Sequence, residues 1–387
     1  MLKSTSEMLA FDFQPRTRVV FGPGSIQRTG TLARDLQFHK TLVVADAGVR
    51  DAGHAKTVLA ILESAGIEPV LFGDFGVNPD SAMVDAGATF AREHGVDSIL
   101  GVGGGSSLDC AKGISFIATN GGRMADYRGY GKVSKPLLPM IGIPTTSGTG
   151  SEAQSYAVIA DADTHMKMAC GDPTAAFKVA ILDPDVTASA PRQVTAMAGY
   201  DALAHAVETA VTQKRTPLSD MFCQHAWKLL NGAYERVLLQ PADADARAAM
   251  MIGSHLAGAA IEQSMLGAAH ACANPLTAKF NLPHGLALAI VLPHVVRWNG
   301  PAVKEGYAAL LGSPRRRMRD EDPADTLARR LEDLALTANL SVTLSDAGVD
   351  AEAIPELAAL AAEQWTGTFN PRPFNAAGAA EIYRAAL

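Results

Sequence analysis

The first half of the chain alternates short apolar runs with helical stretches, and this alternation constrains the fold more than any other feature. Several of the runs are apolar throughout, which is typical of strands buried on both faces of a parallel sheet. Strands that alternate with helices predict an open α/β sheet. We expect strands at 18–21, 41–46, 69–72, 98–102, 140–144 and 179–183. We expect helices between them at 25–36, 55–65, 80–93 and 106–118.

The second half of the chain has a different pattern. From about residue 186 onward, long Ala- and Leu-rich stretches with helical spacing replace the strand signal. These stretches cover 192–212, 217–229, 244–264, 323–338, 354–364 and 376–387. We therefore predict two domains, an α/β domain over 1–185 and a helical domain over 186–387. The longest purely apolar stretch, 286–292, is far shorter than the roughly 18 residues that would span a bilayer.

Charge and cysteine content exclude several classes of protein. Lys and Arg total 33 against 40 Asp and Glu, a net charge of -7, which argues against a nucleic-acid partner. The one basic run, 315–317, is followed closely by acidic residues at 320–322 and predicts a solvated loop. Lys3, Glu7 and Asp12 interrupt the N-terminus, so we expect neither a secretory signal nor a membrane partner. The four cysteines form no CxxC pair, which favours reduced thiols and a cytoplasmic protein.

A run of glycines is the first candidate binding motif. The expected strand 98–102 leads into Gly103, Gly104 and Gly105 and then into a helix. Glycines allow the backbone to approach an anion, and the free amides and positive dipole of a helix N-terminus complete such a site. The alternative is a tight turn in which Ser106 is the N-cap and Asp109 its capping partner, and both interpretations can hold together. The spacing is not the GxGxxG of the standard dinucleotide fingerprint.

Polar residues also follow two of the other expected strands. Asp46 ends the expected strand 41–46, where a carboxylate can accept hydrogen bonds from a ribose diol and would repel a 2′-phosphate. The alternative for Asp46 is an ordinary loop residue. The segment 144–152, Pro-Thr-Thr-Ser-Gly-Thr-Gly-Ser-Glu, offers hydroxyls to phosphate, ribose or amide groups. A flexible linker is the alternative, but the position directly after an apolar strand favours a binding loop.

Histidines and one aspartate form a candidate metal site. Asp201 and His205 lie four residues apart in a helical stretch, so they share one face and can ligate a single ion. The alternative for this pair is a hydrogen bond in the core. His270 and His284 lie among small apolar residues, where an unpaired imidazole would be costly. One carboxylate and three imidazoles suit a divalent transition metal, iron or zinc, with an open position for substrate.

Taken together, these segments resemble the iron-dependent (group III) alcohol dehydrogenase family. The matching segments occur in the family's order across nearly the whole chain, at 103–109, 144–152, 182–185, 199–208, 282–285, 292–295 and 370–373. The resemblance implies a Rossmann-like dinucleotide-binding domain followed by a helical metal-binding domain, which is the dehydroquinate synthase-like fold. It also implies a homodimer or a higher homo-oligomer.

The resemblance also implies which residues form the site. The implied metal ligands are Asp201, His205, His270 and His284, with Fe²⁺ favoured over Zn²⁺. The implied cofactor contacts are Asp46, Asn78, Gly104, Gly105, Ser106, Ser107, Asp109, Thr145, Thr146 and Lys167, and Asp46 favours NAD over NADP. Many members carry a second histidine four residues after the third ligand, where this chain has Asn274. An amide cannot titrate near neutral pH. We therefore name no general base, although Asn274 can orient substrate or water.

The activity implied is reversible hydride transfer between a primary alcohol and its aldehyde. Linear alcohols, diols and ω-hydroxy acids all fit this expectation. One alternative is an enzyme similar to dehydroquinate synthase or glycerol-phosphate dehydrogenase, which would bind a phosphorylated substrate. Apart from Lys279, the metal motifs contain no Lys or Arg, which argues against it. A second alternative is a non-catalytic assembly protein, which four intact ligand positions disfavour.

Overall fold

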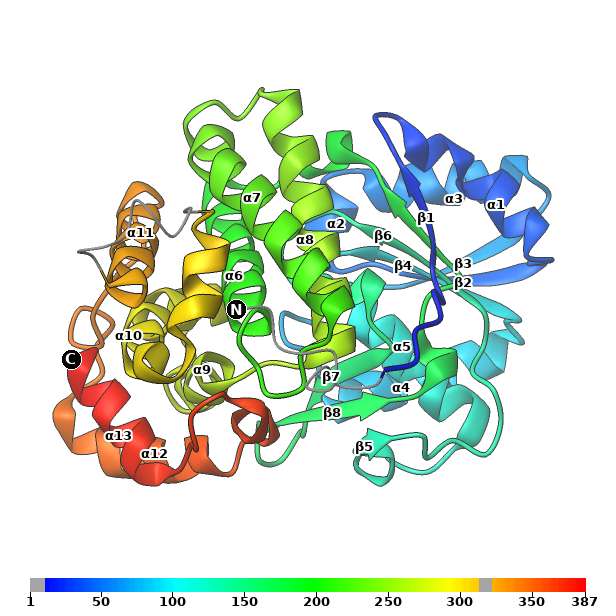
Figure 1. The fold of residues 1–387 in the computed structure, drawn as a ribbon. Helices are drawn as coiled ribbons and strands as arrows, with labels where there is room; N and C mark the ends of the chain where they lie inside the picture. Colours follow the sequence, from blue (N-terminus) through cyan, green and yellow to red (C-terminus); the bar gives the residue numbers. More distant parts are fainter. Residues whose placement is uncertain (1–10, 313–321) are drawn as a thin grey trace. The chain divides into compact units, whose positions relative to one another are not determined.

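The structure is a computed structural model that describes residues 11–312 and 322–387 (Figure 1). The basic run 315–317 and the N-terminal residues Lys3 and Glu7 lie outside the described residues. The chain divides into two compact units, one of residues 14–190 and one of residues 191–387 with 11–13. The division follows Ala190, just past the 3-10 segment Pro184–Ser189, whereas the sequence predicted it after residue 185.

The first unit is built on a six-stranded sheet in which every neighbouring pair is parallel. Its strands are β1 (Arg18–Phe21), β2 (Lys40–Val44), β3 (Glu68–Phe72), β4 (Ser98–Gly103), β6 (Met140–Pro144) and β9 (Val179–Leu182). Their order across the sheet is β1-β9-β6-β4-β2-β3. The predicted α/β class with a parallel sheet is confirmed, and every predicted strand is present.

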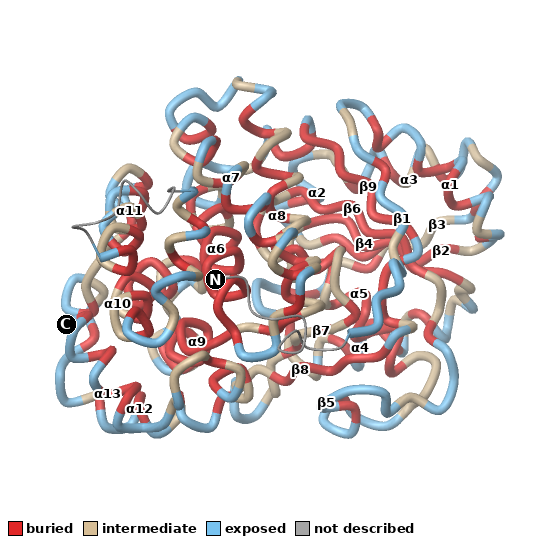
Figure 2. Tube along the Cα trace, in the orientation of Figure 1, coloured by how far each residue is buried: buried red, intermediate tan, exposed pale blue. Residues whose placement is uncertain are grey.

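Both faces of this sheet are covered by helices (Figure 1). Successive side chains of a strand point to opposite faces. Val43 accordingly packs in one core cluster with residues of α1 (Thr29–Asp35) and α3 (His54–Ser64). Leu42 and Val44 pack in another cluster with residues of α4 (Ser81–His94) and α5 (Gly105–Asn120). Burial on both faces explains why the central strands β4 and β6 are apolar throughout (Figure 2).

Several local predictions for this unit were wrong in detail. The expected helix 25–36 is a 3-10 turn, Ser25–Arg28, followed by α1. Strand β2 ends at Val44, and Asp46 instead caps a short helix, α2 (Ala47–Asp51), that was not predicted. A second sheet, in the order β5-β8-β7, was also missed. Its strands β5 (Gly129–Tyr130), β7 (Tyr156–Ala160) and β8 (Lys167–Gly171) have two to five residues, too few for periodicity to separate strand from helix.

The second unit is helical, as predicted, and has one large apolar core. Its helices are α6 (Arg192–Thr209), α7 (Pro217–Leu239), α8 (Ala244–Ser264), α9 (Ala268–Phe280), α10 (His284–Leu310), α11 (Pro323–Thr337), α12 (Ile354–Ala362) and α13 (Ala376–Ala385). Helices α9 and α10 were not predicted because each contains proline in its interior, which normally indicates a helix end. A 3-10 segment, η8 (Trp365–Phe369), follows α12.

Among the described residues, one helix is long and apolar enough to cross a membrane, judged by length and composition alone. This helix is α10, and 61% of its most apolar window is buried inside the structure. A core helix of a helical domain passes the same test, and α10 contributes many residues to the core of its unit. Packing within the unit therefore accounts for its apolar character.

Candidate active site

The carboxyl ends of β2 and β4 form a topological switch point. The chain leaves β2 through α2 and α3 to reach β3 on one side, and it leaves β4 through α5 to reach β6 on the other. In open α/β sheets, ligands bind in the crevice at such a point. Asp46 and the glycine loop of residues 103–105 follow these two strands, so the fold brings both predicted elements to one place.

The glycine loop leaves the N-terminus of α5 open. Gly103 has a φ of 145°, a backbone conformation that favours glycine, and Gly104 is the N-cap and offers no capping side chain. The alternative in which Ser106 caps the helix is wrong, because the helix begins one residue before it. Asp109 Oδ1 instead accepts a hydrogen bond from Ser151 Oγ at 2.6 Å. The first amides of a 16-residue helix and its positive dipole end therefore remain available to an anion.

The hydroxyl-rich loop after β6 packs directly on the glycine loop. A Cβ atom on Gly105 would lie 2.5 Å from Thr149 Cγ2, and one on Gly104 would lie 3.1 Å from Thr146 Oγ1. The amide of Thr145 donates a hydrogen bond to the carbonyl of Gly103 at 3.0 Å. The predicted residues Thr145 and Thr146 thus lie beside the glycine loop. A side chain on Gly105 would collide with Thr149, and one on Gly104 would be tightly packed against Thr146.

Asp46 and Asn78 both contact the first turn of α5. Asp46 Oδ1 accepts from the amide of Val49 at 3.0 Å, and its Oδ2 accepts from Ser107 Oγ at 2.8 Å. Each carboxylate oxygen keeps a second lone pair for a donor such as a ribose hydroxyl. The amide of Asn78, a residue with a φ of 57°, donates to Ser106 Oγ at 3.3 Å.

Asp109 and Lys167 lie deeper, on the side of α5 that faces the second sheet. Burial raises the pKa of Asp109, although the neighbouring Lys112 and the hydrogen bond from Ser151 oppose this shift. Lys112 is fully buried, and its Nζ donates to the carbonyls of Ser151, Gln154 and Tyr156 at 2.7–2.9 Å. Lys167, the first residue of β8, contributes a weaker favourable charge interaction to Asp109. These contacts brace the hydroxyl-rich loop against α5.

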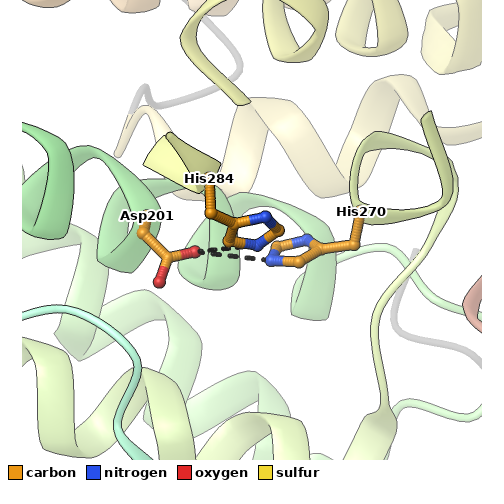
Figure 3. Close-up of side chains that lie close together, drawn as sticks. All are labelled: Asp201, His270 and His284. Carbon is orange, nitrogen blue, oxygen red and sulfur yellow. Dashed lines mark ion pairs between the residues drawn. The ribbon is translucent and has the colours of Figure 1, made fainter. Parts of the chain in front are cut away.

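Three helices of the second unit bring the predicted metal ligands together. Asp201 lies on α6, His270 in the first turn of α9, and His284 at the first residue of α10. One ligand atom from each lies within 4.8 Å of those from the others (Figure 3). Oδ1 of Asp201 is 3.5 Å from Nε2 of His270 and 3.8 Å from Nε2 of His284.

His205 stands next to this group. Its Nε2 is 3.1 Å from Oδ1 of Asp201, one turn earlier on α6, and its ring stacks on that of His270 with the centroids 4.8 Å apart. Three imidazole Nε2 atoms therefore face a single carboxylate oxygen. All four residues predicted as ligands are thus neighbours in the fold.

The burial of these atoms fits a cation site. Oδ1 of Asp201 and Nε2 of His270 are buried and form no hydrogen bond with any of the described residues. Buried polar atoms in proteins are normally paired, so such a cluster requires a bound partner. A nitrogen and oxygen donor set of this kind suits iron or zinc. The His284 side chain is 21% exposed against 6% for the others, which marks the open side of the cluster.

The carboxylates of Asp201 and Glu208 make this buried site favourable for positive charge. Burial alone would raise the pKa of Asp201, but the charges of the surrounding histidines, His205 foremost, hold it well below its usual range. Burial alone would lower the pKa of His270, but Glu208 and Asp201 raise it to about 9. Asp201 is therefore ionised at neutral pH, as a metal ligand must be.

Glu208 is a candidate site residue that sequence reasoning missed. Its Oε2 is hydrogen-bonded to Nδ1 of His270, and its Oε1 accepts from the amide of Ala269 at 2.7 Å. A carboxylate in this position fixes the tautomer and the direction of the ring that it holds. Residues 201, 205 and 208 follow i, i+4, i+7 spacing on one helix face, which is the signal that could have identified it.

Asn274 lies one helical turn beyond His270 on α9. It is half-buried, and its Nδ2 donates a hydrogen bond to Oε1 of Gln364 at 3.1 Å. The predicted position for orienting substrate or water is therefore on the helix that carries a metal-site histidine.

The fold and these two sites define a two-unit protein, with an anion-accepting loop in the α/β unit and a candidate metal centre in the helical unit. The family described as iron-containing alcohol dehydrogenase matches residues 15–184, and its C-terminal counterpart matches residues 195–387. The chain belongs to the iron-containing alcohol dehydrogenase family. The predicted family and enzyme class are therefore confirmed.

Individual relatives cover nearly the whole chain. The NAD-dependent methanol dehydrogenase of Bacillus methanolicus is 33% identical over 95% of this chain and 97% of its own length. A crystal structure of 1,3-propanediol oxidoreductase is 32% identical, has a TM-score of 0.94 and covers 98% of this chain and 100% of that one. Sulfoacetaldehyde reductase from Bifidobacterium kashiwanohense, solved in complex with NAD+, is 27% identical with a TM-score of 0.86, over 97% and 98% of the two chains.

Proposed function

We propose that this protein is an NAD-dependent, metal-dependent alcohol dehydrogenase that interconverts a primary alcohol and its aldehyde. The observation that carries the proposal is the buried group of Asp201, His270 and His284, with His205 beside it, whose ligand atoms converge without a protein partner for Asp201 Oδ1 or His270 Nε2 among the described residues. The names of the relatives, which include an NAD-dependent methanol dehydrogenase and a 1,3-propanediol oxidoreductase, support the same activity.

Asp201, His205, His270 and His284 would hold a divalent metal, with iron favoured by the family and zinc also suited to the donor set. When bound, the metal supplies a Lewis acid that polarises the substrate oxygen and stabilises the developing alkoxide. The chain's own residues prepare the site. Glu208 holds His270 with its Nε2 toward Asp201, and the exposure of His284 leaves room for a substrate on that side.

The α/β unit would hold NAD, which accepts and returns the hydride. The open N-terminus of α5, with Gly104, Gly105, Ser106 and Ser107, is suited to the pyrophosphate. Asp46 is suited to the ribose hydroxyls, and its charge disfavours the 2′-phosphate of NADP. Further contacts proposed for the cofactor are Asn78, Thr145, Thr146 and Lys167. Asp109 instead accepts a hydrogen bond from Ser151 of the hydroxyl-rich loop and so stabilises that loop.

A phosphorylated substrate is disfavoured. Lys279 is the one cationic residue in the metal motifs, and its Nζ lies 2.5 Å from Oε1 of Glu356. Its charge is therefore already paired with a carboxylate. We further propose a cytoplasmic protein without a nucleic-acid partner, which the net charge of -7 and four buried free cysteines support. We propose a homo-oligomer from the membership of the family alone.

The test combines metal analysis of the purified protein with an NADH absorbance assay. The substrate panel should contain linear alcohols, diols, ω-hydroxy acids, the corresponding aldehydes and a phosphorylated polyol. We expect bound iron or zinc, NADH formation with at least one unphosphorylated alcohol, and loss of that activity on chelation. Activity confined to the phosphorylated polyol, or activity that chelation leaves intact, would contradict the proposal.

A further inference from the structure

The first turn of α9, which carries His270, receives little support from its own helix. Its N-cap residue is Gly267, which has no side chain to accept from the first amides. Pro275, inside the same helix, has no N–H and cannot donate to the carbonyl of Ala271, directly after His270. The start of this helix therefore depends on partners from other parts of the chain.

Two side chains that are distant in sequence supply these partners. The amide of Ala268 donates to Oδ1 of Asn370 at 3.2 Å, and the amide of Ala269 donates to Oε1 of Glu208 at 2.7 Å. A Cβ atom on Gly267 would lie 3.0 Å from each of these two oxygens. Glycine at the N-cap thus leaves room for two acceptors that a local capping side chain would crowd.

The hydrogen bonds around Asn370 fix the direction of its amide. Its Nδ2 donates to the carbonyl of Arg372 at 2.8 Å, and because a carbonyl can only accept, Oδ1 is the end that faces Ala268. Asn299 forms two hydrogen bonds with the same amide, at 2.8 and 3.0 Å. Both amides are buried, with exposed fractions of 1% and 2%. Nε2 of Gln213 also donates to the backbone carbonyl of Asn370 at 2.7 Å.

We infer that Asn370 is a positioning residue for the metal centre, which gives the segment 370–373 a role in the site. Its oxygen holds the backbone of the turn that carries His270, whereas Glu208 holds the imidazole itself. Together they keep Nε2 of His270 directed at Oδ1 of Asp201, 3.5 Å away (Figure 3). The inference rests on the proposed function, because it concerns the metal that these ligands would hold.

The test measures the Kd of the apo-protein for Zn²⁺ by competition with a chromogenic chelator, alongside thermal unfolding of the same apo-protein. Asn370→Ala leaves the amide of Ala268 without its acceptor. We expect the Kd to rise about three- to tenfold, the range for one neutral hydrogen bond. The visible absorption bands of the Co²⁺-loaded protein, which depend on the geometry of the ligands, should change as well.

Asn370→Asp separates positioning from packing. Its carboxylate keeps an acceptor for the amide of Ala268, but its second oxygen faces the carbonyl of Arg372, to which the asparagine donates. We therefore expect lower thermal stability with a Kd for Zn²⁺ no higher than that of the wild type. A role limited to packing would make the Kd follow the loss of stability in both variants. Gln213→Met is the matched control, because it removes the hydrogen bond to the backbone of Asn370 and should leave the Kd within twofold.

The outcomes separate this inference from the function on which it rests. If the wild-type protein binds neither Zn²⁺ nor Fe²⁺, the proposed function fails. If it binds metal and oxidises an alcohol while Asn370→Ala keeps the wild-type Kd, the inference alone is overturned, as it is when the Kd rises equally in Asn370→Asp. Should Asn370→Ala fail to fold, Gly267→Ala replaces it, because its Cβ atom would displace both acceptors, and an unchanged Kd in that variant overturns the inference.

Discussion

Glu208 provides a direct test of how this chain prepares its metal centre, because among the described residues His270 is the one implied ligand to which its side chain is hydrogen-bonded. Its Oε1 accepts from the amide of Ala269 and its Oε2 pairs with Nδ1 of His270. In Glu208→Gln, the Ala269 amide still requires an oxygen, so the new amide nitrogen must face Nδ1. That nitrogen donates, which forces the imidazole proton onto Nε2, the atom that faces Asp201.

The magnitude follows from this reversal. An imidazole protonated on Nε2 cannot use that atom as a ligand, so metal binding must either break the new hydrogen bond or lose one donor. Changes at a group that holds a ligating histidine cost about 10- to 100-fold in metal affinity. The lost charge-assisted hydrogen bond, worth about 1.5–3 kcal/mol, corresponds to a similar factor. We therefore expect the metal Kd of Glu208→Gln to rise by about 10- to 100-fold.

The assay is competition between the apo-protein and a chromogenic chelator for Zn²⁺ or Fe²⁺, with thermal unfolding of the apo-protein as a check on folding. The matched control is Glu332→Gln. Glu332 receives Arg297 Nη1 at 2.5 Å and Nη2 at 3.0 Å, on α11 of the same unit, and it takes no part in the metal cluster. A Glu208→Gln protein that folds and binds metal within twofold of the wild-type affinity would refute the reasoning.

The remaining predictions concern both units. His205→Ala should abolish metal binding and dehydrogenase activity together, measured by metal content and NADH formation, and full turnover of a chelated His205→Ala protein would remove this residue from the site. Asp46→Asn keeps an acceptor for the Val49 amide but removes the charge, so the NADP-to-NAD ratio of kcat/KM should rise about tenfold, and an unchanged ratio would remove Asp46 from the ribose site. Gly105→Ala places a Cβ atom 2.5 Å from Thr149 Cγ2 and should weaken NAD binding about tenfold in a fluorescence titration, whereas the control Gly232→Ala, with open space around it on α7, should stabilise the protein by about 0.5–1 kcal/mol; equal NAD binding by the two variants would contradict the proposed cradle.

Local patterns predicted most of the elements, since they depend on the periodicity of apolar residues. The parallel strands are recognisable because both of their faces are buried, as for Leu42 and Val43. The errors fall where local signals are weak or ambiguous. Short strands such as β7 and the proline-containing helix α9 lack a period that separates them from their alternatives.

The sequence by itself determined the residue types and the local geometry of the site. Four residues separate Asp201 from His205, and helical periodicity alone places them on one face. The glycines and hydroxyls at strand ends likewise follow from sequence, because parallel strands end at one edge of a sheet.

Only the tertiary structure decided which distant groups meet. The packing of α6, α9 and α10 brings Nε2 of His270 and His284 to within 3.8 Å of one Asp201 oxygen, and it gives Glu208 its role as the partner of His270. It also orients the amide of Asn274. The carbonyl of Leu360 accepts a hydrogen bond from Gln364, and Gln364 in turn accepts one from Asn274. Such contacts join residues far apart in the chain, and their geometry depends on the packing of whole helices, which no local pattern encodes.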